Sequence, residues 1–391
     1  MELYSYKYSI PYLIFLGYLF ALMFVEFHKI NKQQSTKGVR ILTMAGFLFF
    51  FGLRGWVQTD CFNYYSDFDN FNTIWHGGLQ QIVANAKTET VFWIYAILIK
   101  SIYPNYFFFV FISVLIDVAI LNVVFKRYSK YYVLSFILFF IFFGTIIELN
   151  LLRNVKSILL FLLSLRYLEE RRMLPYMLLN GLGMLFHVSS IVYLPLYFVL
   201  HRNFSKTVHW IIFIIGNILF LSKIQYIQPI FYFLGDIIGG RTETLVHAYF
   251  TNDVFDSPLV VGKAYMERVV TFVVIMLFYT KLKQDRNTCI FVNICLVYVI
   301  CFLYFSEMKV ILDRLSYLFI ASYWIIYANL LNIIQINANR KLYITLIIIA
   351  ALIKTGTPRD ILFKYDNLVF GIQKFEERKK ILDESIDKVK K

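Results

Sequence analysis

The chain has 391 residues, of which 59% are hydrophobic, 19% aromatic and only 16% charged, and its formal net charge is +14. Because soluble domains carry about 25% charged residues, this composition excludes an ordinary soluble protein. A transmembrane barrel is excluded too, since its strands would be short and alternating, whereas the apolar runs here are continuous and near the length of a spanning helix. We therefore predict an all-α fold, that of a polytopic helical membrane protein.

The predicted membrane segments follow one another without a linker, so we expect a single transmembrane domain over residues 1–391. Re-entrant or broken helices belong to this expectation, which gives about 11–13 membrane segments in all. The candidate spans, in chain order, are 8–27, 39–53, 106–125, 131–147, 150–168, 174–200, 208–224, 265–282, 288–305, 310–333 and 341–353.

Basic residues in short loops give the orientation, because loops rich in Lys and Arg stay in the cytoplasm. This spread of charge indicates topology and attraction to membrane lipids, not nucleic-acid binding. Two longer segments, about 54–89 and 225–264, then fall on the outer face, while the charged tail 354–391 is assigned to neither side. The basic clusters are Lys29, Lys32, Lys37 and Arg40; Lys126, Arg127 and Lys130; Arg171 and Arg172; Arg202 and Lys206; Lys281, Lys283 and Arg286; and Arg340 and Lys341.

Two segments do not fit a simple alternation of spans. The run 90–103 is short, contains Lys100 and ends at Pro104, so we expect it to lie in or re-enter the outer leaflet. The run 174–200 has basic residues at both ends, which indicates a broken hairpin whose arms meet near His187; a straight single span is the alternative. Irregular backbone at membrane depth survives only where protein or a wet cavity surrounds it.

The segment NLLRNVKS carries the strongest signal for a site. Asn150, Arg153, Asn154 and Ser157 stand at i, i+3, i+4 and i+7, so a helix would align them on one polar face near its outer end. The planar guanidinium of Arg153 suits a phosphate, to which it makes paired, charge-assisted hydrogen bonds. The alternative is an internal ion pair with Glu148 or another acid.

Other charged residues are weaker candidates. His187, in GMLFHVSS, is either a packed histidine or a group that binds a phosphate or a sugar hydroxyl. Helical spacing puts Glu307, Arg314 and Tyr317 near one face. That face forms either a Glu–Arg pair between helices or, with Arg153, a diphosphate clamp.

The predicted outer segments supply three further candidates. Arg54 and Asp60 follow the second span, and Arg241 follows two glycines, where it would close over a bound anion. The chain contains no P-loop, dinucleotide fingerprint or HExxH motif, and no GxSxG elbow. Its four cysteines lack metal-ligand spacing. We therefore expect neither a metal nor a cofactor.

Several segments together resemble the EpsG family of bacterial exopolysaccharide-synthesis membrane proteins, relatives of the Wzy-type polymerases. They are GLRGWVQTDCFNYYSDF, Glu89 before the next apolar run, LLRNVKSILLFLLSLRYLEERR, LFHVSSIVYLPLY and DRLSYLF. The resemblance implies a GT-C-like, metal-independent glycosyltransferase in the bacterial cytoplasmic (inner) membrane. Its substrates would be oligosaccharide repeat units on undecaprenyl diphosphate, polymerised at the outer face into exopolysaccharide, capsule or O-antigen. A flippase and a chain-length regulator would be partners.

The candidate residues then receive roles by hypothesis. Diphosphate binding is assigned to four arginines, and the base that deprotonates the acceptor hydroxyl is either His187 or Asp60. The remaining candidates would bind sugar or support the site. A flippase for the same lipid and a membrane acyltransferase are the alternative functions. The four arginines are Arg153, Arg314, Arg54 and Arg241, and the supporting residues are Asn150, Asn154, Ser157, Tyr317 and Glu307.

Overall fold

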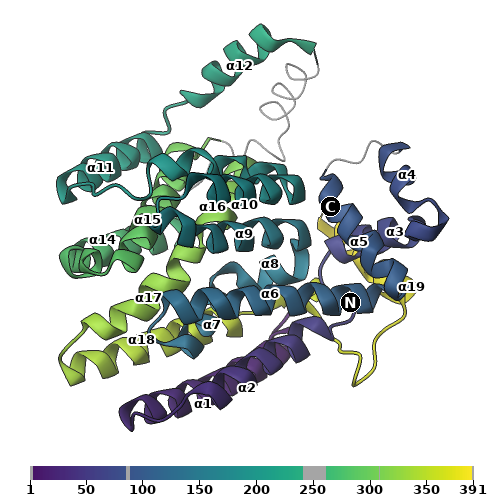
Figure 1. Ribbon diagram of the computed structural model, residues 1–391, viewed down its shortest axis with the longest axis horizontal. Helices are drawn as coiled ribbons and strands as arrows, with labels where there is room; N and C mark the ends of the chain where they lie inside the picture. The colour runs from purple at the N-terminus through teal and green to yellow at the C-terminus, as the bar shows by residue number, and fades with distance from the viewer. Residues whose placement is uncertain (1–2, 85–88, 241–260, 308, 390–391) are drawn as a thin grey trace. The chain divides into compact units, whose positions relative to one another are not determined.

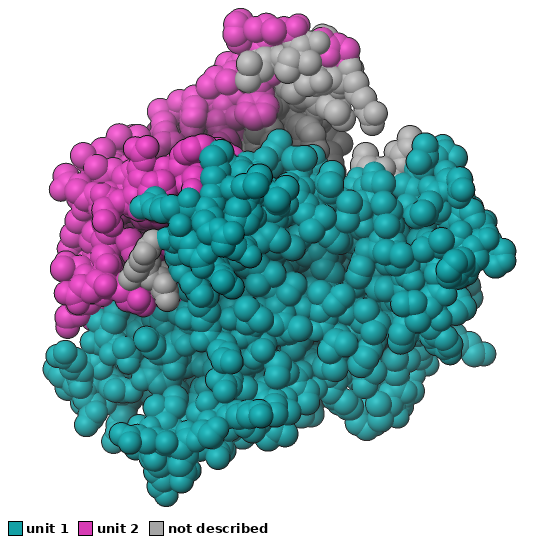
Figure 2. All heavy atoms as spheres, in the orientation of Figure 1, with its two compact units in different colours: residues 1–194, 327–391 teal, residues 195–326 magenta. Residues whose placement is uncertain are grey.

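The computed structural model of the chain describes residues 3–84, 89–240, 261–307 and 309–389. The fold is all-α, as the sequence predicts; the two short strands of the described part, β1 (Tyr4–Ser5) and β2 (Arg359–Asp360), pair with each other. The chain forms two compact units, residues 1–194 with 327–391 (unit 1) and residues 195–326 (unit 2), as Figure 2 shows. The single domain expected from the sequence stays a prediction.

Unit 1 holds most of the helices (Figure 1). Among its described residues, three stretches are long and apolar enough to cross a membrane by themselves: α1, α6, and the combined stretch Tyr132–Asn150. The elements of unit 1 are η1 (Tyr6–Tyr8), α1 (Ile10–Asn31), α2 (Lys37–Phe47), η2 (Leu48–Gly52), α3 (Asp60–Asn70), η3 (Ile74–His76), α4 (Gly78–Ala84), α5 (Thr90–Ile102), α6 (Tyr106–Tyr128), α7 (Tyr132–Phe139), η4 (Phe140–Gly144), α8 (Thr145–Asn150), α9 (Leu152–Glu169), α10 (Met173–Phe186), η5 (Val188–Tyr193), α18 (Asn337–Gly356), η7 (Ile361–Phe363) and α19 (Phe375–Val389).

Among the breaks in the apolar helices of unit 1 are one at Phe142 and Phe143 and one at His187. The stretch Tyr132–Asn150 bends at Phe142 and Phe143, where φ of Phe143 is 62°. Because 89% of this stretch is buried inside the protein, the bend is compatible with membrane depth. The second break is at His187, after which the chain folds back along α10.

The return after His187 confirms the predicted broken hairpin. The Tyr176 hydroxyl in α10 donates to the carbonyl of Tyr193, 2.7 Å away, so the η5 turns lie beside the helix that precedes them. The Tyr193 ring also stacks on Phe161 of α9 at 3.8 Å between ring centres. The alternative of a straight span over 174–200 is therefore wrong.

The C-terminal tail packs on the first external segment. The β1–β2 pair joins it to the N-terminus, and the Gln58 amide donates to the Leu362 carbonyl at 2.9 Å. The rings of Trp56 and Phe375 lie 5.0 Å apart. Residues 3–9, 54–70 and 357–389 thus share one end of unit 1, which we call the tail end. From the sequence alone, the tail could not be assigned to either side of the membrane.

Basic loops gather at the opposite end of the same helices. Arg340, at the start of α18, donates to the Tyr131 hydroxyl at 2.9 Å, and Arg127, at the end of α6, pairs with Glu169 at 2.5 Å. We call this the basic end. It contains loops of unit 1 that the positive-inside rule assigns to the cytoplasm.

The short helix α5 keeps to the tail end. Its 13 residues span about 20 Å, less than the hydrocarbon core. Lys100 near its end donates to the carbonyls of Phe68 and Phe71, each at 2.7 Å, and of Asp69 at 2.9 Å, at the C-terminal end of α3. This geometry agrees with the predicted segment that does not cross.

Among the described residues of unit 2, one predicted span differs from the structure. The predicted span 310–333 is two helices separated at Ile320, and α17 begins in unit 2 and ends in unit 1. Helix α11 and the stretch Ile227–Ile237 meet at 88°. The elements are η6 (Pro195–Phe198), α11 (Lys206–Ser222), α12 (Ile227–Ile238), α14 (Lys263–Gln284), α15 (Arg286–Tyr304), α16 (Lys309–Phe319) and α17 (Ala321–Ile333).

Candidate functional site

The carboxylate of Glu89 lies at the centre of a polar cluster at the tail end of unit 1. Glu89 immediately precedes α5 and has a left-handed backbone, with φ 60° and ψ 47°. Residues other than glycine adopt this conformation rarely, at a cost of about 1–3 kcal/mol, so surrounding contacts must hold it. The side chain is only 6% exposed, and its two oxygens accept hydrogen bonds from different parts of the chain.

Arg153 provides the first of these hydrogen bonds. It lies in the first turn of α9, because the chain breaks at Leu151 and restarts there as a new helix. Its Nη1 donates to Glu89 Oε2, and its Nε lies 3.4 Å from the Tyr64 hydroxyl. The guanidinium carbon is 5.5 Å from the centre of the Tyr64 ring, a cation–π contact. Since 33% of the side chain is exposed, the remaining N–H groups can reach a ligand.

His187 provides the second hydrogen bond, from the break at the end of α10. Its Nδ1 contacts Glu89 Oε1, and because an ionised carboxylate only accepts, Nδ1 carries the proton. In the neutral ring Nε2 then keeps its lone pair, the arrangement of a histidine base oriented by a carboxylate. This Nε2 is buried and has no hydrogen-bond partner among the described residues.

Asn150 fixes the helix that brings Asp60 and Tyr64 to the cluster. Its Oδ1 accepts from the Asp60 amide at 2.9 Å and from the Thr59 hydroxyl at 3.3 Å. Amides in the first turn of a helix have no partner within that helix, so the end of α8 caps the start of α3. Asp60 thereby comes within the electrostatic reach of Arg153.

The two carboxyl groups of the cluster have pKa shifts of opposite sign. Burial alone would raise the pKa of Glu89, but the hydrogen bond from His187 and the charge of Arg153 outweigh it and lower that pKa. Burial raises the pKa of Asp60, and the charge of Arg153 opposes this only in part. Burial also raises the pKa of Tyr64 to about 12, so its phenol stays protonated at neutral pH.

The cluster therefore combines an anion-binding group with an oriented base. Arg153 can hold a phosphate, and His187 Nε2 can take a proton from a hydroxyl group. Within the described parts of the chain, no group of three or more His, Cys, Asp or Glu side chains is placed to hold a metal ion.

The sequence matches one known protein family over most of its length. The model of the EpsG family matches residues 37–355, most of the chain and all of the cluster. The chain belongs to the EpsG family. This family is associated with Wzy-type polysaccharide polymerases, so membership indicates a polymerase role in polysaccharide biosynthesis. No curated protein and no solved structure matches the chain.

The structure of this EpsG-family protein corrects the polar face predicted on NLLRNVKS. Asn150 belongs to α8, and the break at Leu151 separates it from α9, so the four residues do not share one helix. Asn154 is 6% exposed, and the Ser157 hydroxyl donates to the Asn154 carbonyl at 2.8 Å. Of the four residues of the predicted face, Arg153 contacts Glu89 directly. Asn150 supports the cluster indirectly, because it caps the start of α3.

The alternative of an internal ion pair for Arg153 is confirmed, but the acid is Glu89 and not Glu148. Arg153 pairs with Glu89, while Glu148 is 1% exposed and neither of its carboxyl oxygens has a hydrogen-bond partner among the described residues. One turn beyond Arg153, Lys156 instead pairs with Asp117 of α6 at 2.5 Å. Sequence spacing alone did not reveal which acid approaches which base.

Arg54 has a structural contact in place of the predicted ligand contact. It is 3% exposed, and its Nη1 donates to the Phe51 carbonyl at 2.6 Å, which caps the end of η2. Its backbone also bridges to Asn367 of the tail. Arg54 is thus a buried part of the tail-end core.

The remaining predicted residues lie in unit 2 or outside the described residues. Glu307 precedes α16, so it does not share a helical face with Arg314 and Tyr317. Its carboxylate accepts from the amides of residues 226–228 at 2.8–3.1 Å and caps α12. Arg314 is exposed on α16, and its part in a clamp with Arg153 stays a prediction. Arg241 lies outside the described residues.

Sequence reasoning missed Glu89 as a site residue. The available signal was an acidic residue directly before an apolar run too short to span, within an outer segment rich in acids and aromatics. Its importance comes from accepting hydrogen bonds from Arg153 and His187, residues 64 and 98 positions later in the chain.

Proposed function

We propose that this protein joins oligosaccharide repeat units, carried on undecaprenyl diphosphate, at the outer face of the cytoplasmic membrane. The observation that carries the proposal is the carboxylate of Glu89, shared by Arg153 and His187. One shared carboxylate holds an anion-binding guanidinium and a base in fixed relation. Glycosyl transfer from a diphosphate donor needs both.

Arg153 stabilises the leaving group in this proposal. As the bond between the donor sugar C1 and the diphosphate oxygen breaks, negative charge develops on the diphosphate. A guanidinium already oriented by Glu89 and Tyr64 stabilises that charge without reorganising. Its exposed fraction of 33% leaves room for this contact.

His187 activates the acceptor. Its Nε2 takes the proton of an acceptor sugar hydroxyl while the oxygen of that hydroxyl forms the new bond to C1. The products are the extended glycan, free undecaprenyl diphosphate and a protonated His187, whose positive charge is stabilised by the carboxylate of Glu89. Because Nε2 is covered by neighbouring side chains, substrate binding must move one of them before transfer.

The side of the membrane is supported by the two ends of unit 1. The cluster includes Asp60 and Tyr64 of the segment that the positive-inside rule assigns to the outer face. Basic loops lie at the other end of the same helices. Repeat units delivered by a flippase would reach the cluster from the outer leaflet.

Replacement of Arg153 by Ala tests the proposal directly. We expect loss of polymer and accumulation of single lipid-linked units in cells, at an unchanged protein level. Arg166→Ala is the matched control, since Arg166 is on the same helix, 56% exposed and paired only on the surface with Glu170. Normal polymer length in Arg153→Ala cells would refute the role of this residue.

An assay with purified protein separates the proposal from its alternatives. The protein is incubated with lipid-linked repeat units, without nucleotide or acyl donor, and the products are resolved by size. A ladder supports the polymerase. Movement of intact units across a vesicle bilayer without a ladder would support a flippase, and a product that forms only with an acyl donor would support an acyltransferase.

A further inference from the structure

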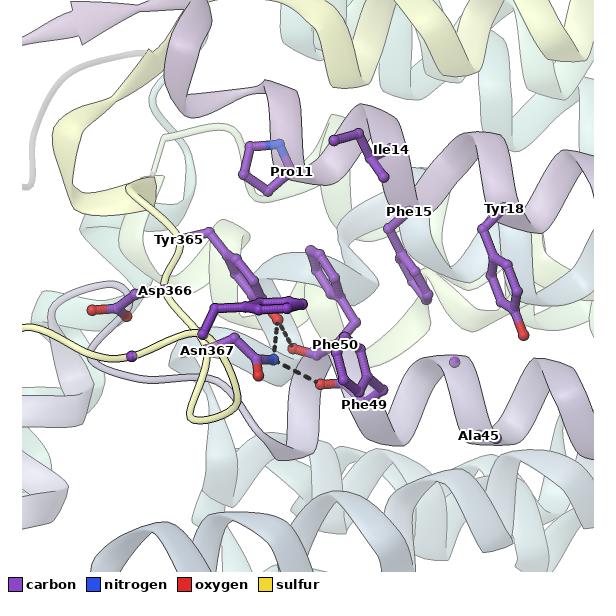
Figure 3. A pocket seen from close by; sticks show the side chains of 13 residues that line it. Pro11, Ile14, Phe15, Tyr18, Ala45, Phe49, Phe50, Tyr365, Asp366 and Asn367 are labelled. Atoms are coloured by element: carbon purple, nitrogen blue, oxygen red, sulfur yellow. Dashed lines mark hydrogen bonds between the residues drawn. The ribbon is translucent and has the colours of Figure 1, made fainter.

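An apolar groove of about 820 Å³ lies between α1 and the helix formed by α2 and η2, with the tail across one end (Figure 3). Aromatic rings from all three elements line it. One wall is α1, which is long and apolar enough to cross a membrane, and the other lies within the predicted span 39–53. The lining residues are Pro11, Ile14, Phe15, Tyr18, Ala45, Gly46, Phe49, Phe50, Tyr365, Asp366, Asn367, Phe370 and Gly371.

The tail end of the groove is held by hydrogen bonds to η2. This π-helical turn leaves backbone carbonyls without their usual helical partners. The Tyr365 hydroxyl donates to the Phe50 carbonyl at 2.7 Å, and Asn367 Nδ2 donates to the Phe49 carbonyl at 3.1 Å. The Tyr365 ring also stacks on Phe50 at 4.5 Å. This end of the groove is therefore built into the fold.

The groove is open at the surface of the protein. Ile14 on one wall is 69% exposed and Phe49 on the other is 42% exposed. At the tip of the tail loop Leu368, Val369 and Phe370 are 37%, 61% and 81% exposed. Three consecutive exposed apolar residues beside a spanning helix are suited to hydrocarbon, so the chemistry of the occupant is that of a lipid chain.

The charges at the groove favour one kind of lipid chain. None of the described residues that line it is Lys or Arg, and the ionisable side chain at its tail end is the carboxyl group of Asp366. A phospholipid whose chain filled the groove would present its phosphate near this carboxyl, with no cation among the lining residues; Lys364 and Arg378 lie within electrostatic reach of Asp366 from outside the lining. A long prenyl chain can instead occupy the groove while its diphosphate binds elsewhere.

A short polypeptide segment connects this groove to the polar cluster around Glu89. Phe50 lines the groove, and residues 53–59 run from η2 to Asp60, which Asn150 fixes at the cluster. The tail contacts the same connection, with the Gly55 amide donating to the Asp366 carbonyl at 3.0 Å. A diphosphate bound at Arg153 and a prenyl chain bound along α1 and α2 would therefore both lie at the tail end of unit 1.

We propose that this groove binds the prenyl chain of the lipid-linked substrate. This inference rests on the proposed function, because the prenyl chain belongs to the substrate of that reaction. The groove would keep the chain on α1 and α2 while the diphosphate reacts at Arg153.

Photolabelling tests the groove without requiring catalysis. The probe is undecaprenyl diphosphate with a diazirine in its chain and no sugar, added to the purified full-length protein. We expect labelled peptides from α1 and from α2–η2, and loss of the label with excess undecaprenyl diphosphate but not with excess phosphatidylglycerol. Equal competition by the phospholipid, or labelling elsewhere, would overturn the proposal.

Two matched tryptophan variants localise the effect. Ala45 is exposed and lines the groove, so Ala45→Trp fills it, whereas Leu42→Trp puts the same bulk on an exposed position of α2 that does not line it. We expect a several-fold loss of labelling in the first variant only. Ile14→Trp fills the groove from the opposite wall and replaces Ala45→Trp if that variant fails to fold. If a variant whose groove is filled folds normally and is still labelled as strongly as the wild type, the groove is not the binding site of the prenyl chain.

A kinetic comparison separates this inference from the proposed function. In the polymer assay, Ala45→Trp should raise KM several-fold for substrates with a full-length prenyl chain and leave KM unchanged for short-chain analogues. A ladder from the wild-type protein, with labelling outside the groove, would overturn the groove alone. Labelling in the groove without any ladder would overturn the polymerase and leave the prenyl site standing.

Discussion

Two ion pairs stand one turn apart on α9 and differ in what surrounds them. Arg153 pairs with Glu89, and Lys156 pairs with Asp117. In the first pair the side chains are 33% and 6% exposed, and in the second they are 4% and 0% exposed. The first carboxylate also receives His187, whereas the second lysine donates additionally to the Ser113 carbonyl at 2.9 Å.

The difference shows how exposure separates a ligand site from a structural contact. A fully buried pair has no free N–H group to offer a substrate, and breaking it leaves an uncompensated charge. A partly exposed pair with a shared carboxylate keeps both a guanidinium edge and an oriented base. The same types of charged residue in one apolar helix therefore predict opposite outcomes for mutation.

The largest effect on folding is expected at the buried pair. Lys156→Met leaves the carboxylate of Asp117 buried and unpaired, which should lower the free energy of unfolding by about 3–5 kcal/mol. Protein yield and the thermal unfolding midpoint measure this loss. The double variant Asp117→Leu with Lys156→Met removes both charges and should recover most of it. A Lys156→Met protein as stable as the wild type would contradict the structural role assigned to the buried pair.

At the exposed pair we expect loss of activity with little loss of stability. Glu89→Gln keeps the shape of the side chain but removes the charge that orients Arg153 and His187, so polymerisation should slow by about 10²-fold. The rate of ladder formation is the measurement, and Glu376→Gln on the exposed side of α19 is the control. A purely structural role for Glu89 predicts instead a lower unfolding midpoint at an unchanged rate per folded molecule.

A hydrogen bond of the tail involves no charged group, so its loss should have a smaller effect on stability than the loss of the buried ion pair. Tyr365→Phe removes the hydrogen bond to the Phe50 carbonyl and leaves that carbonyl without this partner, at a cost of about 1–3 kcal/mol. Thermal unfolding measures the cost. Tyr6→Phe, at a position 68% exposed, should be neutral. An equal effect at the two tyrosines would argue against a tail held by η2.

The smallest expected effect is a pH dependence with opposite signs at Glu89 and Asp60. The pKa of Glu89 is lowered on folding, so its ionised form stabilises the protein above about pH 4.3, and this stabilisation is lost as the pH falls through the folded pKa. The pKa of Asp60 is raised on folding, so its ionisation costs stability as the pH rises through that value.

Unfolding midpoints across pH provide the measurement. At neutral pH, Glu89→Gln should be less stable than the wild-type protein and Asp60→Asn more stable, and both differences should shrink in acid. Differences of the same sign, or differences that persist below the carboxyl pKa range, would contradict the assigned environments.

The sequence by itself determined the class of the fold and most of the segment boundaries. Continuous apolar runs require helices in a membrane, since no other structure satisfies an isolated backbone there, and α6 and α18 begin and end within a few residues of their predicted limits. It also identified Arg153 and His187, because a charge or imidazole in an apolar run is costly and visible.

Only the tertiary structure decided how those residues meet. Glu89 joins Arg153 and His187 across 64 and 98 positions, and no local periodicity encodes such a contact. The break at Leu151 and the docking of the tail on residues 53–58 depend equally on packing between distant segments. Hydrophobic spacing fixes which segments enter the membrane, but the partner of a buried charge is chosen by the helices that pack around it.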